Sequence, residues 1–139
     1  MVRGIGVEVV AISELAGHVP EGAGGGVVPD GAALDAFVLG TFTETERAQA
    51  WGRVRPAQYL AGRLAVKKAV LKAVAPVEAL ASDGFDLRVI ECIDGADGAP
   101  RVTCAGPLAP VLARAGVRDV LVSISNEAGL AIAFAVAQG

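Results

Sequence analysis

The sequence predicts an α+β fold: a single domain in which a mainly antiparallel sheet packs on one long helix. Alternating apolar patterns near both ends of the chain predict strands, and one strong helical pattern lies between them. No repeat or interdomain linker interrupts the 139 residues, a length at which one domain buries its own core. We therefore expect residues 1–139 to form one domain, with a Gly/Pro-rich loop insertion at residues 17–32.

The first half of the chain predicts a strand followed by helices. Residues 4–12 alternate as a strand does, with Val7 and Val9 on one face and Glu8 on the other. Thr43 and Glu46 have the spacing of a capping box, which predicts a helix start at this point. Residues 56–74 carry leucines and valines at helical spacing, and the next proline, Pro76, ends that pattern. This is the long helix of the predicted fold.

The second half alternates hairpins with a short helix. Turn-forming residues separate apolar stretches of strand length, and Gly116 follows a short helical stretch. The expected elements are strands at 85–92 and 101–105, a helix at 107–115, and strands at 120–125 and 130–136.

Composition excludes several classes of protein. Hydrophobic residues make up 53% of the chain and charged residues 19%, so the sequence is not typical of disorder. The longest clean apolar stretch, residues 128–137, is too short to span a bilayer, so we expect no membrane insertion. A net charge of -3 and 4% aromatic residues argue against nucleic-acid binding. The N-terminus does not resemble a secretory signal, which favours a cytoplasmic location.

Cations are concentrated in one segment. Residues 47–77 contain no Asp or Glu, and they hold most of the basic residues of the chain. Such a segment is either a solvated basic face or a site for a phosphorylated ligand. Lys67 lies on the apolar stripe of the long helix, where its ammonium must reach solvent, a carboxylate or a bound anion.

Several of these segments, taken together, resemble one family. The matching motifs are GIGVEVVAI, TFTETE, YLAGRLAVKKAVLKAV, DGAPRV and VSISNEAGLAIAFAV, in that order. The chain resembles the holo-acyl-carrier-protein synthases, the short type of 4′-phosphopantetheinyl transferase. That resemblance implies transfer of phosphopantetheine from coenzyme A to an acyl carrier protein. It also implies a homotrimer with sites between subunits, and Mg²⁺ held by one acid on a strand and one on the helix.

The resemblance assigns roles to particular residues. Glu8 matches the metal-binding acid on the strand, and Glu8 and Lys68 are the candidate catalytic residues. The candidate coenzyme A-binding residues are Arg63, Lys67, Lys72, Ser125 and Asn126.

Four departures from the family pattern fall at functional positions: Lys68, Asn126, Glu14 and the pair Ala75 and Pro76. The first two concern the metal and the proton transfer. Lys68 stands where the helix acid is usual, and an ammonium repels Mg²⁺ instead of binding it. Asn126 replaces a histidine, so it can form hydrogen bonds but cannot exchange a proton. We therefore hypothesise that the Lys68 ammonium takes the place of the metal and pairs with Glu8.

Three functions are compatible with these residues. The first is phosphopantetheine transfer with an altered metal site. The second is a repurposed homologue that catalyses another step of polyketide or other secondary-metabolite biosynthesis through Glu8 and Lys68. The third is a non-catalytic member that binds a carrier protein or another subunit. Fold alone does not choose among them, because function depends on the site.

Overall fold

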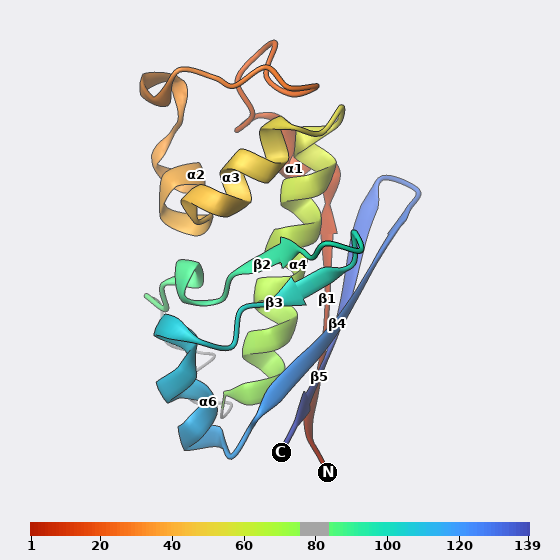
Figure 1. Cartoon of the computed structure of the whole chain (residues 1–139). Coiled ribbons are helices and arrows are strands. Elements are labelled where there is room, and N and C mark those ends of the chain that lie inside the picture. Colours follow the sequence, from red (N-terminus) through yellow and green to blue (C-terminus); the bar gives the residue numbers. More distant parts are fainter. Residues whose placement is uncertain (76–83) are drawn as a thin grey trace.

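The computed structural model describes residues 1–75 and 84–139, and within them it forms two antiparallel sheets and a set of helices. The larger sheet has the strand order β1-β5-β4, and the smaller is the hairpin β2-β3 (Figure 1). The strands are β1 (Val2–Ala11), β2 (Cys92–Asp94), β3 (Pro100–Val102), β4 (Asp119–Glu127) and β5 (Leu130–Gln138). The helices are α1 (Ile12–Ala16), α2 (Ala36–Thr41), α3 (Glu44–Trp51), α4 (Pro56–Val74) and α6 (Ala109–Ala115), with short 3-10 turns at Gly31–Ala33, Leu87–Val89 and Gly106–Leu108.

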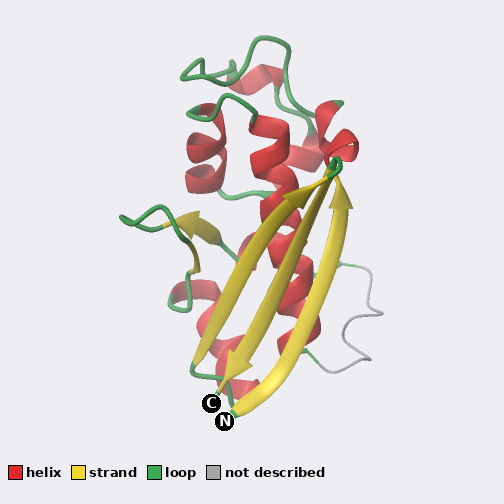
Figure 2. Ribbon diagram, turned by 90° about the vertical axis from the view of Figure 1, so that its right-hand side faces the viewer, coloured by secondary structure: helices red, strands yellow, loops and turns green. Residues whose placement is uncertain are grey.

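The long helix α4 lies across one face of the three-stranded sheet, as Figures 1 and 2 show. Its observed bounds match the predicted residues 56–74, and Pro56 occupies the first turn, where a missing N–H is tolerated. Ala75 is already extended, as expected for a residue that precedes a proline. The prediction of an α+β domain with an antiparallel sheet on one long helix is therefore confirmed.

Small residues let the sheet approach α4 closely. A Cβ atom at Gly6 would lie 1.9 Å from the backbone oxygen of Ala69, and one at Gly4 would lie 1.9 Å from that of Ala73. On the neighbouring strand β5, the four residues that face the helix are fully buried alanines: Ala131, Ala133, Ala135 and Ala137. Because each of these positions is small, β1 and β5 pack almost backbone to backbone against the helix.

The opposite face of the sheet is apolar and exposed. Ile5, Val9, Leu121 and Phe134 are between 49% and 66% exposed, although all are large hydrophobic residues. Figure 2 shows this broad face of the sheet with the helices behind it. No helix of the described chain covers this face, so these side chains remain in contact with solvent in a single copy.

The first predicted hairpin is shorter than expected. Instead of a strand over 85–92, the chain forms a 3-10 turn at Leu87–Val89 and a three-residue strand at Cys92–Asp94. The pattern fits a strand, but the carbonyls of Leu87 and Ile90 accept hydrogen bonds from Lys67 instead of from a neighbouring strand. The partner strand is Pro100–Val102, not 101–105.

The second predicted hairpin is longer than expected. Strands β4 and β5 pair up to Glu127 and Leu130, so the turn contains only Ala128 and Gly129. Both turn residues have positive φ, 50° and 78°, as tight two-residue hairpin turns require. The helix predicted at 107–115 appears as a 3-10 turn followed by α6, and Gly116 ends it in the left-handed conformation.

The Gly/Pro-rich segment is hydrogen-bonded to the end of α3 and to the loop that leads into α4. The backbone N–H groups of Gly25 and Gly26 donate to the carbonyls of Arg53 and Trp51, over 2.6 and 2.8 Å. That residues 17–32 are an insertion stays a prediction from the sequence. Over residues 1–75 and 84–139, no helix combines the length and the apolar character needed to cross a membrane.

Candidate functional site

Glu8 and Lys72 form an ion pair at the edge of the sheet. The Glu8 Oε2 atom lies 3.0 Å from the Lys72 Nζ atom, and the Val9 N–H donates to Glu8 Oε1 over 3.1 Å. Lys72 also donates to the carbonyl of Val7, over 3.1 Å. Both oxygens of the Glu8 carboxylate and one strand carbonyl thus hold this cluster in place.

The strand pleat explains why Glu8 meets the helix. Successive side chains alternate between the faces of a strand, so Glu8 shares a face with Gly6 and Val10. That face packs on α4, and the close approach at Gly6 brings Glu8 beside the lysines of the helix. Lys68 lies one helical turn before Lys72, and its charge also acts on Glu8.

The environment keeps Glu8 ionised. Partial burial raises the pKa of the Glu8 carboxyl, but the hydrogen bonds from Lys72 and Val9 and the charges of Lys72 and Lys68 outweigh burial. The pKa of Glu8 is therefore lower than usual, and at neutral pH the group is a carboxylate.

The hypothesis of a Glu8–Lys68 ion pair needs correction. The lysine that contacts Glu8 is Lys72, while Lys68 is exposed to solvent and acts on Glu8 only through its charge. Lys72 gains a second acceptor in the carbonyl of Val7, which fixes its ammonium at Glu8. Lys68 makes no ion pair with any residue in the described part of the chain.

The magnesium ion that the family resemblance implies does not fit these residues. Mg²⁺ prefers oxygen ligands, but the donor set at Glu8 is one carboxylate beside two ammonium groups. Both oxygens of that carboxylate already have a partner. Within residues 1–75 and 84–139, no group of three or more His, Cys, Asp or Glu side chains could hold a metal ion.

A second cationic site lies at the start of α4. It is a polar cavity of about 240 Å³ between the N-terminal half of α4, the β2-β3 hairpin and β4. The cavity is lined by Arg53, Arg55, Gln58, Tyr59, Gly62, Arg63, Asp94, Gly98, Pro100, Ile124 and Asn126. We call it the arginine cavity. The positive end of the α4 dipole adds to the charge of its three arginines, so the cavity favours anions.

Arg63 is the buried arginine of this cavity. Its guanidinium lies over the Tyr59 ring, 4.1 Å from the ring centroid, and its Nη2 atom donates to Asp94. Arg53, from the loop before α4, also contacts the Asp94 carboxylate. The Nε atom of Arg63 is buried and makes no hydrogen bond to any described residue.

A short network fixes the walls of the arginine cavity. The Tyr59 hydroxyl donates to Gln49 Oε1 over 2.6 Å, and the Asp94 N–H donates to the same oxygen over 2.9 Å. Helix α3 thereby connects α4 to the β2-β3 hairpin. The observed α3 begins with the predicted capping box of Thr43 and Glu46.

Lys67 lies in the core and is unavailable to a ligand. Its side chain is 0% exposed, and its ammonium donates to Glu46 Oε1 at 2.7 Å and to the carbonyls of Ile90 and Leu87 at 2.6 and 3.1 Å. These bonds use all three protons of the ammonium. The coenzyme A-binding role predicted for Lys67 is therefore wrong for this structure. The buried Glu46 carboxylate binds the ammonium where a phosphate of the ligand was expected to bind.

Asn126 and Ser125 point to different faces of the sheet. Asn126 lines the arginine cavity together with Arg63, as the resemblance implies. Ser125 is the neighbouring residue of β4 and opposes Ile132 of β5, so the pleat directs its side chain to the exposed apolar face. Ser125 therefore does not join Arg63 within one chain, and its role stays a prediction.

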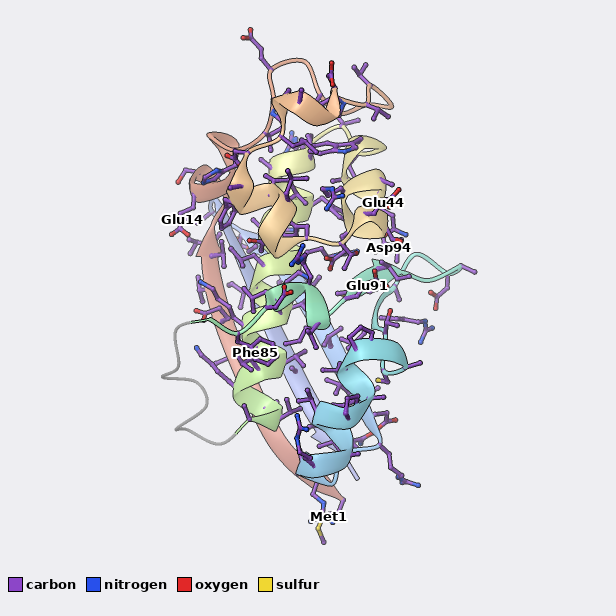
Figure 3. The ribbon with its side chains drawn as sticks, turned by 90° about the vertical axis from the view of Figure 1, so that its left-hand side faces the viewer. Met1, Glu14, Glu44, Phe85, Glu91 and Asp94 are labelled. Atoms are coloured by element: carbon purple, nitrogen blue, oxygen red, sulfur yellow. The ribbon has the colours of Figure 1, made fainter. Side chains whose placement is uncertain are left out.

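The two cationic sites of one chain lie at opposite edges of the sheet. Glu8 belongs to the edge strand β1, whereas the arginine cavity borders the other edge strand, β4. Figure 3 shows Asp94 on the far side of α4 from β1. Helical periodicity agrees, because Lys68 and Lys72 lie about 140° and about 180° around α4 from Arg63.

Comparison with known proteins agrees with the resemblance. No protein-family model matches the chain. The holo-[acyl-carrier-protein] synthase of Desulforudis audaxviator is 32% identical over 139 residues, which are 100% of this chain and 95% of that protein. That of Clavibacter michiganensis is 33% identical over 139 residues, or 100% of this chain and 98% of that protein. The chain belongs to the holo-acyl-carrier-protein synthase family.

The fold of this family member is also that of solved synthases. The acyl carrier protein synthase of Mycobacterium tuberculosis is 28% identical, with a TM-score of 0.68 over 100% of this chain and 99% of that one. The holo-[acyl-carrier-protein] synthase of Neisseria meningitidis has a TM-score of 0.74 at 24% identity, over 100% of both chains. At 24% identity, the likeness to the Neisseria meningitidis structure shows a shared fold and nothing more. The family membership places the chain in the 4′-phosphopantetheinyl transferase superfamily.

Some residues of the synthase site escaped prediction from the sequence. Arg53 and Arg55 belong to the acid-free segment, so their charge was visible, but nothing local placed them beside Arg63. Asp94 resembles an ordinary residue of a turn-rich loop, and only the folded chain brings it to the two arginines.

Proposed function

We propose that this protein transfers 4′-phosphopantetheine from coenzyme A to a serine hydroxyl of an acyl carrier protein. Its membership of the synthase family supports this proposal. Solved structures of the same fold from Helicobacter pylori and Bacillus anthracis are complexes with coenzyme A. The observation that carries the proposal here is that the chain has two cationic sites, one at each edge of the sheet, because coenzyme A carries phosphates at two places along its length.

The reaction forms one phosphorus–oxygen bond and breaks another. The serine oxygen attacks the phosphorus that bears the pantetheine, and the bond to the second phosphate of the pyrophosphate breaks. Adenosine 3′,5′-bisphosphate leaves with the oxygen that bridged the two phosphorus atoms, and the serine oxygen stays bonded to the transferred phosphorus. The proton of the serine hydroxyl passes to the Glu8 carboxylate, which its surroundings keep ionised. No step in this scheme is assigned to a metal ion.

The two sites have different tasks in this proposal. The arginine cavity takes the nucleotide end of coenzyme A, where Arg53, Arg63 and Asn126 offer donors to a phosphate. Lys72 and Lys68 lie beside Glu8 and neutralise the pyrophosphate around the reacting phosphorus. Lys67 has no part in binding because it is buried.

We propose further that the chain assembles as a homotrimer. The two sites of one chain lie at opposite edges of the sheet, so in this proposal one coenzyme A bridges the β1 edge of one copy and the β4 edge of the next. Contacts of that head-to-tail kind close into a ring when the rotation allows it. The exposed apolar face of the sheet gives such a ring a surface to bury.

The other two functions have less support. The relatives named above are holo-acyl-carrier-protein synthases, and none points to another biosynthetic step or to a binding-only role. A cytoplasmic location stays a prediction from the sequence.

Intact-mass measurement tests the proposed transfer. The protein is incubated with coenzyme A and several apo carrier proteins, with a carrier whose acceptor serine is changed to alanine as the control. We expect one carrier to gain the mass of a single phosphopantetheine, with release of adenosine 3′,5′-bisphosphate. Absence of any mass gain across the carriers would rule out the proposal.

Dephospho-coenzyme A tests the arginine cavity separately. It lacks the 3′-phosphate, so its affinity should be weaker by roughly tenfold to a hundredfold, since hydrogen bonds to charged groups contribute about 1.5–3 kcal/mol. Equal affinities would show that the cavity does not hold that phosphate.

A further inference from the structure

The cluster at Glu8 already contains the positive charge that a divalent cation would supply. Lys72 contacts the Glu8 carboxylate at 3.0 Å, and Lys68 adds a second ammonium one helical turn away. We infer that this chain holds the pyrophosphate of coenzyme A with the Lys68 and Lys72 ammonium groups and needs no divalent cation to do so. The inference rests on the proposed function, because it concerns how the same site binds its substrate.

Charge balance supports this substitution of an ammonium for a metal. A carboxylate that binds a divalent cation forms a unit of net charge +1, and the single ammonium of Lys68 carries the same charge. With Glu8 and Lys72 balancing each other, the whole cluster is left with a net charge of +1. The pyrophosphate would therefore meet a positive field without any bound ion.

The placement of the two lysines suits this task. Lys72 is anchored by Glu8 and by the carbonyl of Val7, but its side chain is still 45% exposed and can donate to a ligand. Lys68 is exposed and makes no ion pair with any residue in the described part of the chain, so its ammonium reaches solvent where it can contact a phosphate. An ammonium binds phosphate as a compact point charge and imposes little geometry.

The ammonium groups of Lys68 and Lys72 would repel a metal ion at this position. It would have to displace Lys72 from Glu8 and would then lie between two ammonium groups with one carboxylate as its protein ligand. Mg²⁺ demands near-octahedral oxygen coordination, which this cluster does not offer. The cluster therefore selects against a divalent cation while it attracts an anion.

Calorimetric titration of coenzyme A into the full chain tests the inference. We expect its Kd in excess EDTA to agree within about twofold with its Kd in millimolar Mg²⁺. A Kd that is about tenfold or more weaker in EDTA would overturn the inference and leave the proposed function intact. Absence of binding in both buffers would instead refute the proposed function, and this inference with it.

Variants at Lys68 sharpen the test. Lys68→Glu should lose coenzyme A binding in EDTA by about tenfold or more and regain it with Mg²⁺, because a carboxylate pair can now hold the ion. Lys68→Gln is the matched control: it should bind weakly in both buffers, since it removes the ammonium without adding a carboxylate. Mg²⁺ rescue of Lys68→Gln, or equal binding by all three proteins, would contradict the role of Lys68.

A Mn²⁺ titration gives a readout that is independent of coenzyme A. The electron paramagnetic resonance signal of free Mn²⁺ should not be depleted by the wild-type protein but should be depleted by Lys68→Glu. The double variant Glu8→Gln/Lys68→Glu should abolish that depletion if the ion lies at Glu8. Stoichiometric Mn²⁺ binding by the wild-type protein that is lost in Glu8→Gln would overturn the inference.

Discussion

At the scale of single residues, Lys67 and Lys68 are adjacent in the sequence but occupy opposite environments. Lys67 is fully buried and gives its three protons to Glu46 and two carbonyls, whereas Lys68 is exposed beside Glu8. Burial lowers the pKa of Lys67, and the Glu46 carboxylate opposes that effect. The first lysine thus serves the fold and the second serves the proposed site.

The stability of the fold should depend on Lys67 and not on Lys68. Lys67→Met leaves the buried Glu46 carboxylate without its cation, so we expect the free energy of unfolding to fall by about 3–5 kcal/mol. Lys68→Met is the matched control and should change it by less than about 0.5 kcal/mol. Urea denaturation measures both values, and equal destabilisation would contradict the assigned burial.

The Glu8 carboxylate should be required for transfer but not for binding. As the proton acceptor, it should contribute about 10²–10⁴-fold to the rate, so Glu8→Gln should lose that factor while binding coenzyme A at least as tightly. A weaker affinity with an unchanged transfer rate would contradict its assignment as the base.

The acid limb of the pH–rate profile should reflect the lowered pKa of Glu8. The ionised form accepts the proton, and because the pKa lies below its usual range, activity should persist to lower pH than an ordinary glutamate allows. The stability of the fold should depend on pH in the same direction. The Glu8–Lys72 ion pair stabilises the fold when the pH is above the pKa of Glu8 in the unfolded chain. This contribution is lost as the pH falls through the lower pKa of Glu8 in the folded chain. A Glu8-dependent decline near neutral pH would contradict this environment.

At the scale of elements, the contact between β1 and α4 positions the site. Gly4 and Gly6 bring the strand so close that a Cβ at either position would overlap a helix carbonyl. Glu8 lies two residues further along the same face, which explains how a residue of an edge strand reaches Lys72. The glycines of this strand therefore matter for packing and not for backbone flexibility.

Adding a methyl group at Gly6 should separate these two elements. Its Cβ would lie 1.9 Å from the backbone oxygen of Ala69, so Gly6→Ala must displace the strand or the helix. We expect a loss of about 1–3 kcal/mol in the free energy of unfolding. Gly17→Ala is the control, because no atom lies within 4 Å of its Cβ and its φ is -71°. Thermal unfolding of both variants checks the difference, and a neutral Gly6→Ala would refute the close contact.

At the scale of the whole molecule, the sheet has one covered and one uncovered face. Helix α4 covers the alanines of β5, while Phe134, Ile5 and Leu121 are exposed on the other side. The proposed trimer would bury that face and bring the β1 edge of one copy to the β4 edge of another. Assembly and ligand binding are therefore coupled in this proposal.

A charge on the exposed face should prevent assembly without unfolding the chain. Phe134 is 53% exposed at the centre of the sheet, so Phe134→Asp should convert the trimer to folded monomers and weaken coenzyme A binding. Val28→Asp, at a position that is 70% exposed outside the sheet, is the control and should leave the trimer intact. Light scattering after size-exclusion chromatography gives the masses, with circular dichroism to verify folding. A wild-type monomer would contradict the proposal.

The elements that have local signals could be predicted from the sequence alone. A proline at the start and another after the end defined helix 56–74, and the spacing of Thr43 and Glu46 defined the start of α3. Alternation defined β1 and the β4-β5 hairpin because one face of each strand packs on α4. The family motifs add the expected location of Glu8 and Arg63.

The partner of each charged residue could be assigned only from the folded chain. Lys67 could have met solvent, an anion or a carboxylate, and only the position of Glu46 in the fold settles the choice. The assignment of Lys72 to Glu8, and of Asp94 to Arg53 and Arg63, depends equally on distant segments. Local patterns carry no information about such pairs, because residues as far as 64 positions apart, as Glu8 and Lys72 are, meet only when the core packs.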